Sequence, residues 1–315
     1  MRRPDERGIA LLLTLLVLTL LVALILEFDA EARREYRDAA AFRDHFKATV
    51  LARASVQAAR AVLQQDLLRD KLTGQYYDAP TDLWAFPIRD YAIGDGLVTA
   101  QIEDERGKVN LNDLAVPGDA TARKAKIQRV KRLFDLVQVN PELVDAIVDW
   151  VNPDDVPEPS GAESQYYQTL RPAYRAANGP LQTLLELRVV KGMTPEIIDK
   201  LSKVATVYPE EGESWININT ADSLVIQSLD PGITQTMAAE IIQARPFKTS
   251  QELDRVSGAA EIMRTLRGTR VYDVKSDMFS ARMTLTINEV IQQAATVVQR
   301  DPATGKSTVK YFRIF

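Results

Sequence analysis

An acidic loop near the middle of the chain carries the residues best suited to chemistry. Residues 149–163 contain Asp149, Asp154, Asp155 and Glu163, interrupted by three prolines and followed by two tyrosines. Carboxylate and carbonyl oxygens are the hard ligands that Ca²⁺ takes, with a geometry that an irregular loop can supply. The spacing is not that of an EF-hand, and acidic loops are also found simply solvated. Composition therefore predicts either a calcium site or a solvated acidic loop.

Other kinds of reactive site lack their residues. The chain has no cysteine, which excludes disulfides, thiolate nucleophiles and cysteine-bound zinc, and its single histidine is His45. His45 lies in a stretch with helical periodicity, and we interpret it as a solvated histidine on a helix surface. The net charge of −4 disfavours a general nucleic-acid binder, because such proteins neutralise phosphates with clustered Lys and Arg. We predict a protein that is not an enzyme.

A glycine-containing turn offers an alternative function. Residues 218–253 resemble a helix-hairpin-helix module, whose turn exposes backbone amides to a nucleic-acid phosphate, and Gly232 and Thr234 would make that contact here. Membrane-anchored competence receptors for DNA carry such modules. However, the turn has no second glycine, and acidic residues outnumber basic ones between residues 216 and 258. DNA binding is therefore kept as the alternative, and the main prediction has no nucleic-acid partner.

The N-terminal part of the chain contains a segment that fits a membrane. Residues 9–26 are uncharged and apolar, and as a helix they cover nearly the hydrocarbon thickness of a bilayer. Basic residues outnumber acidic ones before this segment, which favours a cytoplasmic N-terminus. No small-residue cleavage site follows it, so the helix is expected to stay attached to the product. We predict a single-pass membrane protein with most of the chain outside.

The elements that position these residues are predicted from the periodicity of the sequence. Apolar residues at helical spacing extend the first helix through residues 29–75 as a stem. Residues 76–115 and 271–315 alternate apolar and polar side chains around turn residues, which indicates strands of one sheet. Residues 116–270 are mainly helical. The predicted fold class is α+β, with a long N-terminal transmembrane and stem helix, an antiparallel sheet domain and a large all-helical insertion domain.

The helical insertion repeats itself. Residues 186–192 and 252–258 share a Glu-Leu-x-x-Val-x-Gly pattern, and residues 108–112 resemble residues 215–219, each predicted as a short strand that stops at an asparagine. Two copies of one pattern imply two similar structural units. We therefore predict two helix-hairpin-helix-like units within the insertion.

The residues before the apolar segment resemble the leader of type IV prepilins, which prepilin peptidase cuts after a glycine. By this resemblance residues 1–8 are the leader, cleavage falls between Gly8 and Ile9, and residues 9–28 are the transmembrane helix. Most members of the class have a glutamate at the fifth mature position, where this chain has Leu13. The lack of this glutamate, together with large size, resembles the K-type minor pseudopilins of type II secretion systems.

The order of several motifs along the chain carries the resemblance to this family. These are the leader, the apolar helix, residues 107–112, the acidic loop with Gly-Ala-Glu and paired tyrosines, and residues 217–221. In the family this loop binds calcium. Matching by position assigns Asn152, Asp154, Asp155 and Glu163 as ligands, with Asn152 standing where the family usually has aspartate.

The resemblance implies a structural role in protein secretion. It implies a pilin-like sheet domain, processing by prepilin peptidase, methylation, and a location in the bacterial inner membrane with the head in the periplasm. It also implies a place at the tip of the pseudopilus, because a large insertion would prevent further subunits from stacking above. The expected partners are the I-type and J-type minor pseudopilins and the major pseudopilin. Together the minor subunits would start assembly for the export of folded periplasmic proteins.

Overall fold

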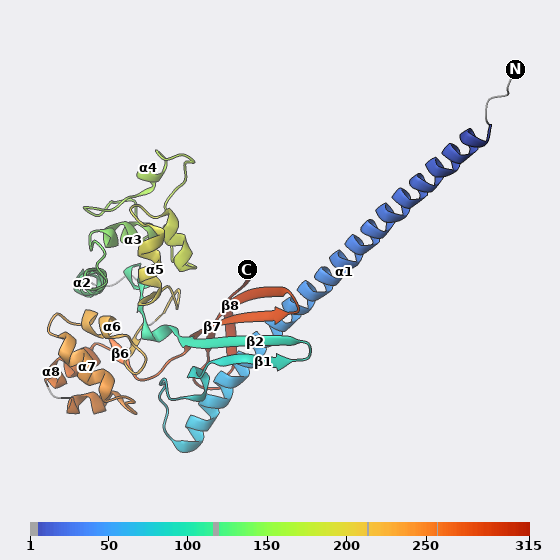
Figure 1. Cartoon of the computed structure of the whole chain (residues 1–315). Coiled ribbons are helices and arrows are strands. Elements are labelled where there is room, and N and C mark those ends of the chain that lie inside the picture. Colours follow the sequence, from blue (N-terminus) through green and yellow to red (C-terminus); the bar gives the residue numbers. More distant parts are fainter. Residues whose placement is uncertain (1–5, 116–119, 213, 257) are drawn as a thin grey trace.

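A single long helix determines the shape of the molecule. The computed structural model describes residues 6–115, 120–212, 214–256 and 258–315, so the predicted leader residues 1–5 lie outside the described residues. Helix α1 (Glu6–Thr73) projects far beyond the rest of the chain (Figure 1). It runs without a break through the predicted transmembrane and stem segments. All described side chains of residues 9–26 are exposed, as expected for a helix whose N-terminal half has no partner within the chain.

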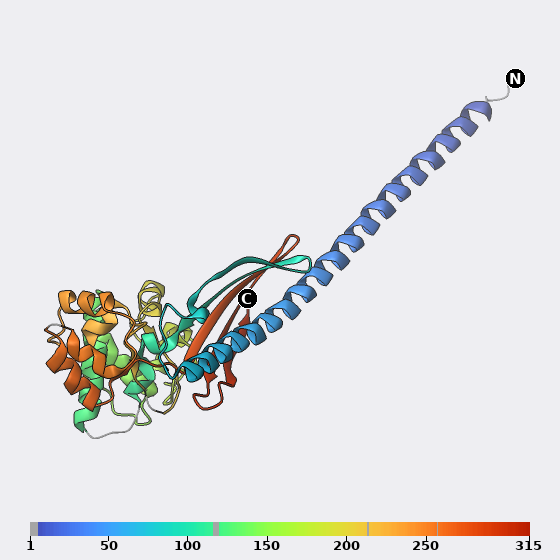
Figure 2. The ribbon, with the colours of Figure 1, turned by 90° about the horizontal axis from the view of Figure 1, so that it is seen from below.

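The second half of α1 packs on one face of a five-stranded antiparallel sheet (Figure 2). The strand order is β1-β2-β7-β8-β9, so strands from both flanks of the helical insertion form one sheet. The register between β2 and β7 is unbroken from Gly96 opposite Ile287 to Asp104 opposite Phe279. The bounds are β1 (Ile88–Ile93), β2 (Gly96–Asp104), β7 (Met278–Ile287), β8 (Val290–Arg300) and β9 (Ser307–Ile314).

Apolar side chains hold the stem helix to the sheet. Burial alternates along much of β7, which is the period-two pattern of a strand with one face against a helix. The edge of the Trp84 ring packs against Phe279, with ring centroids 5.2 Å apart. Both rings join a buried cluster that α1 completes with Ala52, Val56 and Leu63. This contact surface is what fixes the direction of the stem relative to the head.

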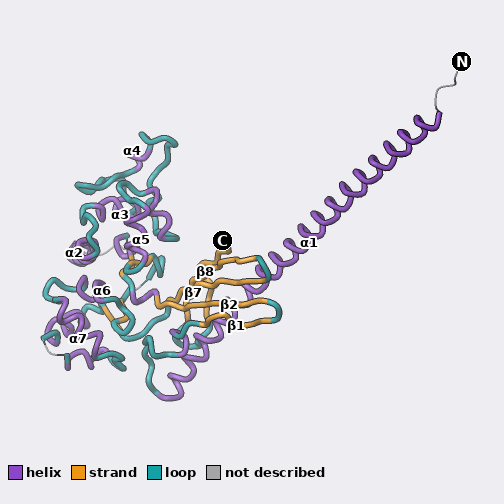
Figure 3. The backbone as a smooth tube through the Cα atoms, viewed as in Figure 1, coloured by secondary structure: helices purple, strands orange, loops and turns teal. Residues whose placement is uncertain are grey.

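The insertion lies between β2 and β7 and is mainly helical, as Figure 3 shows. The α+β fold class is confirmed, but the prediction of an all-helical insertion is wrong in one respect: it also contains two short parallel strand pairs. Its helices are α2 (Ala120–Leu136), α3 (Leu143–Val151), α4 (Ser164–Tyr167), α5 (Pro195–Ser202), α6 (Ser223–Ser228), α7 (Gln235–Gln243) and α8 (Ala260–Gly268). Its strands are β3 (Val109–Asn110), β4 (Ala205–Thr206), β5 (Ile216–Asn217) and β6 (Tyr272–Asp273).

Two similar units make up this insertion. In the first, β3 pairs in parallel with β4 after α2, α3 and α5; in the second, β5 pairs in parallel with β6 after α6, α7 and α8. Each unit has a 3₁₀ helix before its last α-helix, at residues 184–189 and 250–255. In each unit the strand that ends the unit lies beside the strand that begins it, so the chain enters and leaves the unit at the same place.

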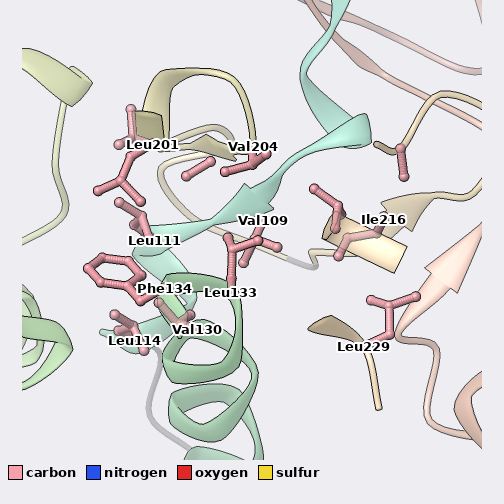
Figure 4. Close-up of a cluster of buried hydrophobic side chains, with 14 of the residues drawn as sticks. Val109, Leu111, Leu114, Val130, Leu133, Phe134, Leu201, Val204, Ile216 and Leu229 are labelled. Carbon is pink, nitrogen blue, oxygen red and sulfur yellow. The ribbon is translucent and has the colours of Figure 1, made fainter. Parts of the chain in front are cut away.

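One apolar core joins the two units. Side chains of β3 and α2 meet those of β5 and α6 in a single buried cluster (Figure 4). Leu133 and Phe134 of α2 are fully buried there, as is Leu111, which directly follows β3. Residues 109–114 therefore pack with the helical insertion, although the sequence prediction assigned them to the sheet domain. The two units thus form one head at the end of the sheet.

Candidate functional site

The acidic loop follows α3 and ends at residue 181. Side chains of α3 position its first half. Asp149 accepts hydrogen bonds from the backbone N–H of Glu158 at 3.0 and 3.2 Å, and Asp145 accepts one from Ser160 at 3.2 Å. Both aspartates are buried on α3. Both carboxylates bind the backbone of the loop. Asp149 therefore supports the loop, and it is not one of the predicted ligands.

A close approach of backbone to side chain occurs at Gly161. A Cβ atom at this position would lie 1.9 Å from Oδ2 of Asp149, which no side chain tolerates. Lys191 holds the same turn from the other side, because its Nζ donates to the carbonyls of Ser160 and Gly161 at 3.2 and 2.8 Å. These contacts fix the backbone immediately before Glu163.

Aromatic side chains form the base of the loop. The Tyr167 ring stacks on Tyr174 with centroids 5.1 Å apart and meets Trp150 edge to face, also at 5.1 Å. Tyr167 is fully buried and its hydroxyl accepts a hydrogen bond from the Lys191 backbone at 3.2 Å. The Asp-Trp and Tyr-Tyr pairs of the sequence therefore pack together. Their role in this structure is to anchor both ends of the acidic loop.

The structure brings the predicted ligands into one neighbourhood. Asn152 and Glu163 are buried, at 4% and 5% exposure, whereas Asp154 and Asp155 are exposed. Nδ2 of Asn152 donates to Oδ2 of Asp154 at 3.3 Å. Negative charge from Asp154 and Asp155 also acts on the Glu163 carboxyl. The loop thus combines two exposed carboxylates, Asp154 and Asp155, with the buried side-chain oxygens of Asn152 and Glu163.

Asn178 is a member of this group that the sequence analysis missed. Its Nδ2 donates to Oδ1 of Asp155 at 3.1 Å, which ties the end of the loop to its beginning. It adopts a positive φ of 45°, a conformation that asparagine tolerates better than most residues. The Asn-Gly-Pro order at residues 178–180 was a turn signal, but nothing local linked it to Asp155.

Among the residues that the structure describes, no hydrogen-bond partner is found for four buried oxygen atoms of the loop. They are Oδ1 of Asn152, Oδ1 of Asn178 and both carboxyl oxygens of Glu163. Burying an unsatisfied polar atom costs about 1–3 kcal/mol, more for a charged one, so such atoms usually mark a missing partner. Burial, followed by the charges of Asp149, Asp155 and Asp154, raises the pKa of Glu163 to about 7.

These atoms fit a hard cation. All four are oxygens, and Ca²⁺ binds carboxylate and amide oxygens together in flexible geometry. In the described part of the chain, the carboxylates of Asp154, Asp155 and Glu163 do not all lie within 4.8 Å of one another. The asparagine oxygens would therefore have to complete the set. The structure places Asn152, Asp154, Asp155 and Glu163 in one loop with Asn178, and their assignment as calcium ligands stays a prediction.

The alternative DNA site has an unfavourable geometry. The N–H of Gly232, which would have to meet a phosphate, donates to Oδ1 of Asp230 at 2.7 Å. A side chain at Gly232 would lie 2.8 Å from Ile262, so this glycine serves helix packing. Oγ1 of Thr234 accepts from the N–H of Met237 at 3.2 Å and caps α7. A phosphate at this turn would meet a carboxylate.

The N-terminal residues of interest lie on the free part of α1. Gly8 and Ile9 are exposed in its first turns, and no heavy atom lies within 4 Å of a Cβ built on Gly8. In the described part of the chain, α1 is the one helix long and apolar enough to cross a membrane. Leu13 is exposed on this helix. His45 is exposed on α1, as expected for a solvated histidine.

Comparison with known proteins gives a consistent result. Family profiles described as type II secretion system protein K match residues 107–210 and 216–269. The type II secretion system protein K of Klebsiella pneumoniae is 30% identical over 255 residues, covering 76% of this chain and 75% of that protein. The protein of the same name from Pseudomonas aeruginosa is 27% identical over 311 residues, covering 95% and 90%.

The fold also matches a solved structure. A chain in the crystal structure of the GspK-GspI-GspJ complex from enterotoxigenic Escherichia coli superposes with a TM-score of 0.75 at 21% identity, covering 87% of this chain and 97% of that one. The first profile spans the first unit from β3 to β4, and the second begins with β5 and ends just before β6. With its long N-terminal helix, its sheet built from strands on both sides of the insertion and its two-unit insertion, this chain belongs to the type II secretion system protein K family.

Proposed function

We propose that this chain is the minor pseudopilin at the tip of a type II secretion pseudopilus. Its N-terminus lies in the cytoplasm, α1 crosses the inner membrane, and the head lies in the periplasm. After removal of residues 1–8 by prepilin peptidase and methylation, it assembles with I-type and J-type minor pseudopilins above the major pseudopilin. This complex starts assembly for the export of folded proteins, and the subunit acts by packing and not by catalysis.

The single observation that carries this proposal is the position of the head relative to the stem. The two helical units lie at the end of the sheet away from the free part of α1 (Figure 1). A subunit stacking above would need this position for its own stem. Subunits below meet an apolar helix surface instead: Phe42, Phe46 and Val50 are 75%, 62% and 52% exposed. The chain therefore offers a lower binding surface and obstructs the upper one.

The lack of an ionisable group in the apolar segment of α1 agrees with a position at the tip of the pseudopilus. A carboxylate inside the bilayer is costly and needs a partner. Residues 9–26 contain none, and Leu13 stands where other pilin-like subunits have glutamate. A subunit at the tip has no neighbour above it, so a carboxylate in its helix would have no partner on such a neighbour.

Co-purification from membranes tests the proposal. The full chain, tagged at its C-terminus, should copurify with I-type and J-type minor pseudopilins in detergent. Phe46→Glu places a charge on the proposed binding surface and should abolish this, whereas Tyr166→Glu on the acidic loop should not. Copurification that survives Phe46→Glu would place the contacts elsewhere. Failure of the untagged partners to copurify at all would contradict the tip role.

We also propose that the acidic loop binds Ca²⁺ through Asn152, Asp154, Asp155 and Glu163, with Asn178 as an additional donor. The buried unpartnered oxygens described above support this assignment. Bound Ca²⁺ would supply no chemistry beyond charge compensation and would hold the loop closed. Calorimetry on the full chain in detergent, after EGTA treatment and dialysis, should give a binding heat with calcium.

A further inference from the structure

A second group of carboxyls lies where α1 ends. Asp66 and Asp70 stand in its last two turns, and Asp78 and Asp82 in the loop that follows. Arg300, at the end of β8, is fully buried against them. It forms an ion pair with Asp78 and a longer one with Asp66 at 3.4 Å. We name Asp66, Asp70, Asp78 and Asp82 the stem-end cluster.

The charges of the stem-end cluster do not balance. One guanidinium faces four carboxyls, and oxygens of Asp66, Asp78 and Asp82 lie within 4.8 Å of one another. Oδ2 of Asp70 is buried and has no hydrogen-bond partner within the described part of the chain. The C-terminal end of α1 adds negative potential, because the last carbonyl groups of a helix carry the negative end of its dipole. Like charges this close in a partly buried site cannot all be ionised at little cost.

The other ionisable groups around the cluster do not restore the balance. Arg69 of α1 lowers the pKa of both Asp70 and Asp82, but its effect is weaker than those of burial and of Arg300, and its side chain is exposed. Lys71 is exposed and donates to the carbonyl of Ala303. The other neighbours are negative or neutral, namely Tyr76, Tyr77, Asp104, Glu252 and Asp277. One further cation, Lys275, lies over the Tyr76 ring, with its Nζ 4.8 Å from the ring centroid.

The pKa values of the carboxyls follow this environment. Burial first, and then the charges of neighbouring aspartates, raises the pKa of Asp66 and of Asp70 to about 7. Burial also raises the pKa of Asp82 and of Asp78, against the opposing effect of Arg300. Coupled groups of this kind titrate together, so the protons belong to the cluster and not to one residue.

We propose that the stem-end cluster is a proton-dependent latch, in which carboxyls sharing protons hold the end of α1 to the following loop and to β8, and loss of these protons loosens that contact. The latch is independent of the tip role and of calcium binding. It goes beyond both by making the attachment of the stem sensitive to pH.

Hydrogen bonds connect the latch to the helical insertion, and Asn217 donates directly to the backbone carbonyl of Asp78 at 2.9 Å. Asp78 accepts from the N–H of Ser276 at 2.7 Å, and the hydroxyl of Ser276 donates to Asp104. Asp104 also accepts from Asn217 at 2.8 Å and from Thr220 at 2.6 Å, both in the second helical unit. Loosening at Asp78 is therefore passed to the joint between the sheet and the helical insertion.

Protons can reach the latch from solvent. A cavity of about 330 Å³ opens beside it, lined mainly by polar residues that include Asp66, Asp70 and Asp82. The direction of the pH effect follows from proton counting. Because the folded cluster binds more protons than unfolded aspartates, whose pKa is about 4, the latch is strongest at low pH. It weakens as the pH rises toward and through about 7.

Hydrogen exchange on the full chain in detergent, with mass spectrometry, tests the latch. The readout is the protection of residues 62–82, corrected for the intrinsic pH dependence of exchange by reference to residues 284–293, the turn end of the β7–β8 hairpin away from Arg300. Between pH 6 and 8 the opening equilibrium of this segment should rise about tenfold for each shared proton released. Asp70→Asn, which mimics the protonated side chain, should flatten this dependence and raise the protection at pH 8.

A control variant outside the latch and two contrary results complete the test. Asp95→Asn removes an exposed aspartate that pairs with Lys47 outside the latch, and it should leave the pH profile of residues 62–82 unchanged. Equal protection at pH 6 and pH 8 in the parent chain would overturn the proposal. So would a gain in protection of this segment on adding CaCl₂ that Asp70→Asn abolishes, because the cluster would then hold a cation instead of protons.

Discussion

The side chain of Asn219 forms two hydrogen bonds with the backbone of Phe247. Its Nδ2 donates to the carbonyl at 2.9 Å, and its Oδ1 accepts from the N–H at 2.8 Å. Asn112 makes the same pair of bonds with Leu181, at 2.9 and 2.8 Å, in the first helical unit. The repeated sequence pattern thus reflects a repeated structural device, in which a buried asparagine fastens the far end of each unit.

This pairing predicts a large effect of truncation. Asn219→Ala leaves both backbone groups of Phe247 buried without a partner, which should lower the free energy of unfolding by about 3 kcal/mol. Asn112→Ala should cost a similar amount. The measurement is urea denaturation followed by tryptophan fluorescence. Gln243→Ala, an exposed amide on α7, is the control and should change stability by less than about 0.5 kcal/mol. An equally small effect of Asn219→Ala would contradict the fastening role.

Removal of calcium should destabilise the head if the acidic loop binds it. A ligand present at about 100 times its dissociation constant adds about 2.7 kcal/mol of stability, so EGTA should lower the Tm of the full chain. In Glu163→Gln the effect of EGTA should largely disappear. Glu158→Gln, which changes a half-exposed loop residue paired with Arg123, should keep the response. A Tm that ignores calcium in the parent chain would rule out the site.

Gly161 provides a geometric test of the same loop. Gly161→Ala forces a Cβ atom against Asp149, so the backbone before Glu163 must move. Outer residues that orient metal ligands typically contribute 10–100-fold to affinity, and we expect calcium binding measured by calorimetry to weaken by at least about tenfold. The control is Gly179→Ala, where the nearest heavy atom is 3.7 Å from the added Cβ. The idea fails if both variants bind calcium like the parent.

Processing at Gly8 can be separated from folding. Because no heavy atom lies within 4 Å of a Cβ on Gly8, Gly8→Ala should leave the head unchanged. It should nevertheless block cleavage by prepilin peptidase, and mass spectrometry should then find the leader still attached. Gly268→Ala, which also adds a Cβ in open space, should be processed normally with Ile9 as the first residue. Normal cleavage of Gly8→Ala would count against the leader assignment.

The helix-hairpin-helix-like turn should not bind DNA. With the Gly232 N–H bonded to Asp230, an incoming phosphate meets negative charge and no free amide at this position. A gel-shift assay with the full chain in detergent at about 0.15 M salt should show no retardation. Retardation that Gly232→Val abolishes would restore the DNA-binding alternative.

Much of this structure was predictable because its signals are local. The apolar residues 9–26, the alternation in the strands and the turn residues between them each act over a few positions, so periodicity located α1 and the sheet. The repeated asparagines at 112 and 219 were visible as a pattern. Their purpose was not, because their partners lie 69 and 28 positions further along the chain.

The ligand group of the acidic loop was predictable only in part. Asn152, Asp154, Asp155 and Glu163 lie in one short stretch whose composition indicates oxygen ligands. Asn178 joins them only because the loop closes, and that closure depends on Lys191 and the packed tyrosines. The extra length between Asn112 and Leu181, compared with the second unit, is where this loop is accommodated.

By itself the sequence determined the membrane-compatible helix and the α+β class, which follow from the period and polarity of neighbouring residues, and the two-unit insertion, which follows from a repeated motif. Only the tertiary structure decided which charges share a site. Asp66 and Arg300 are 234 positions apart, and they meet because β8 ends beside the last turns of α1. Packing of the helix on the sheet thus buries more carboxyls than one guanidinium can neutralise, and no local pattern in the chain carries that information.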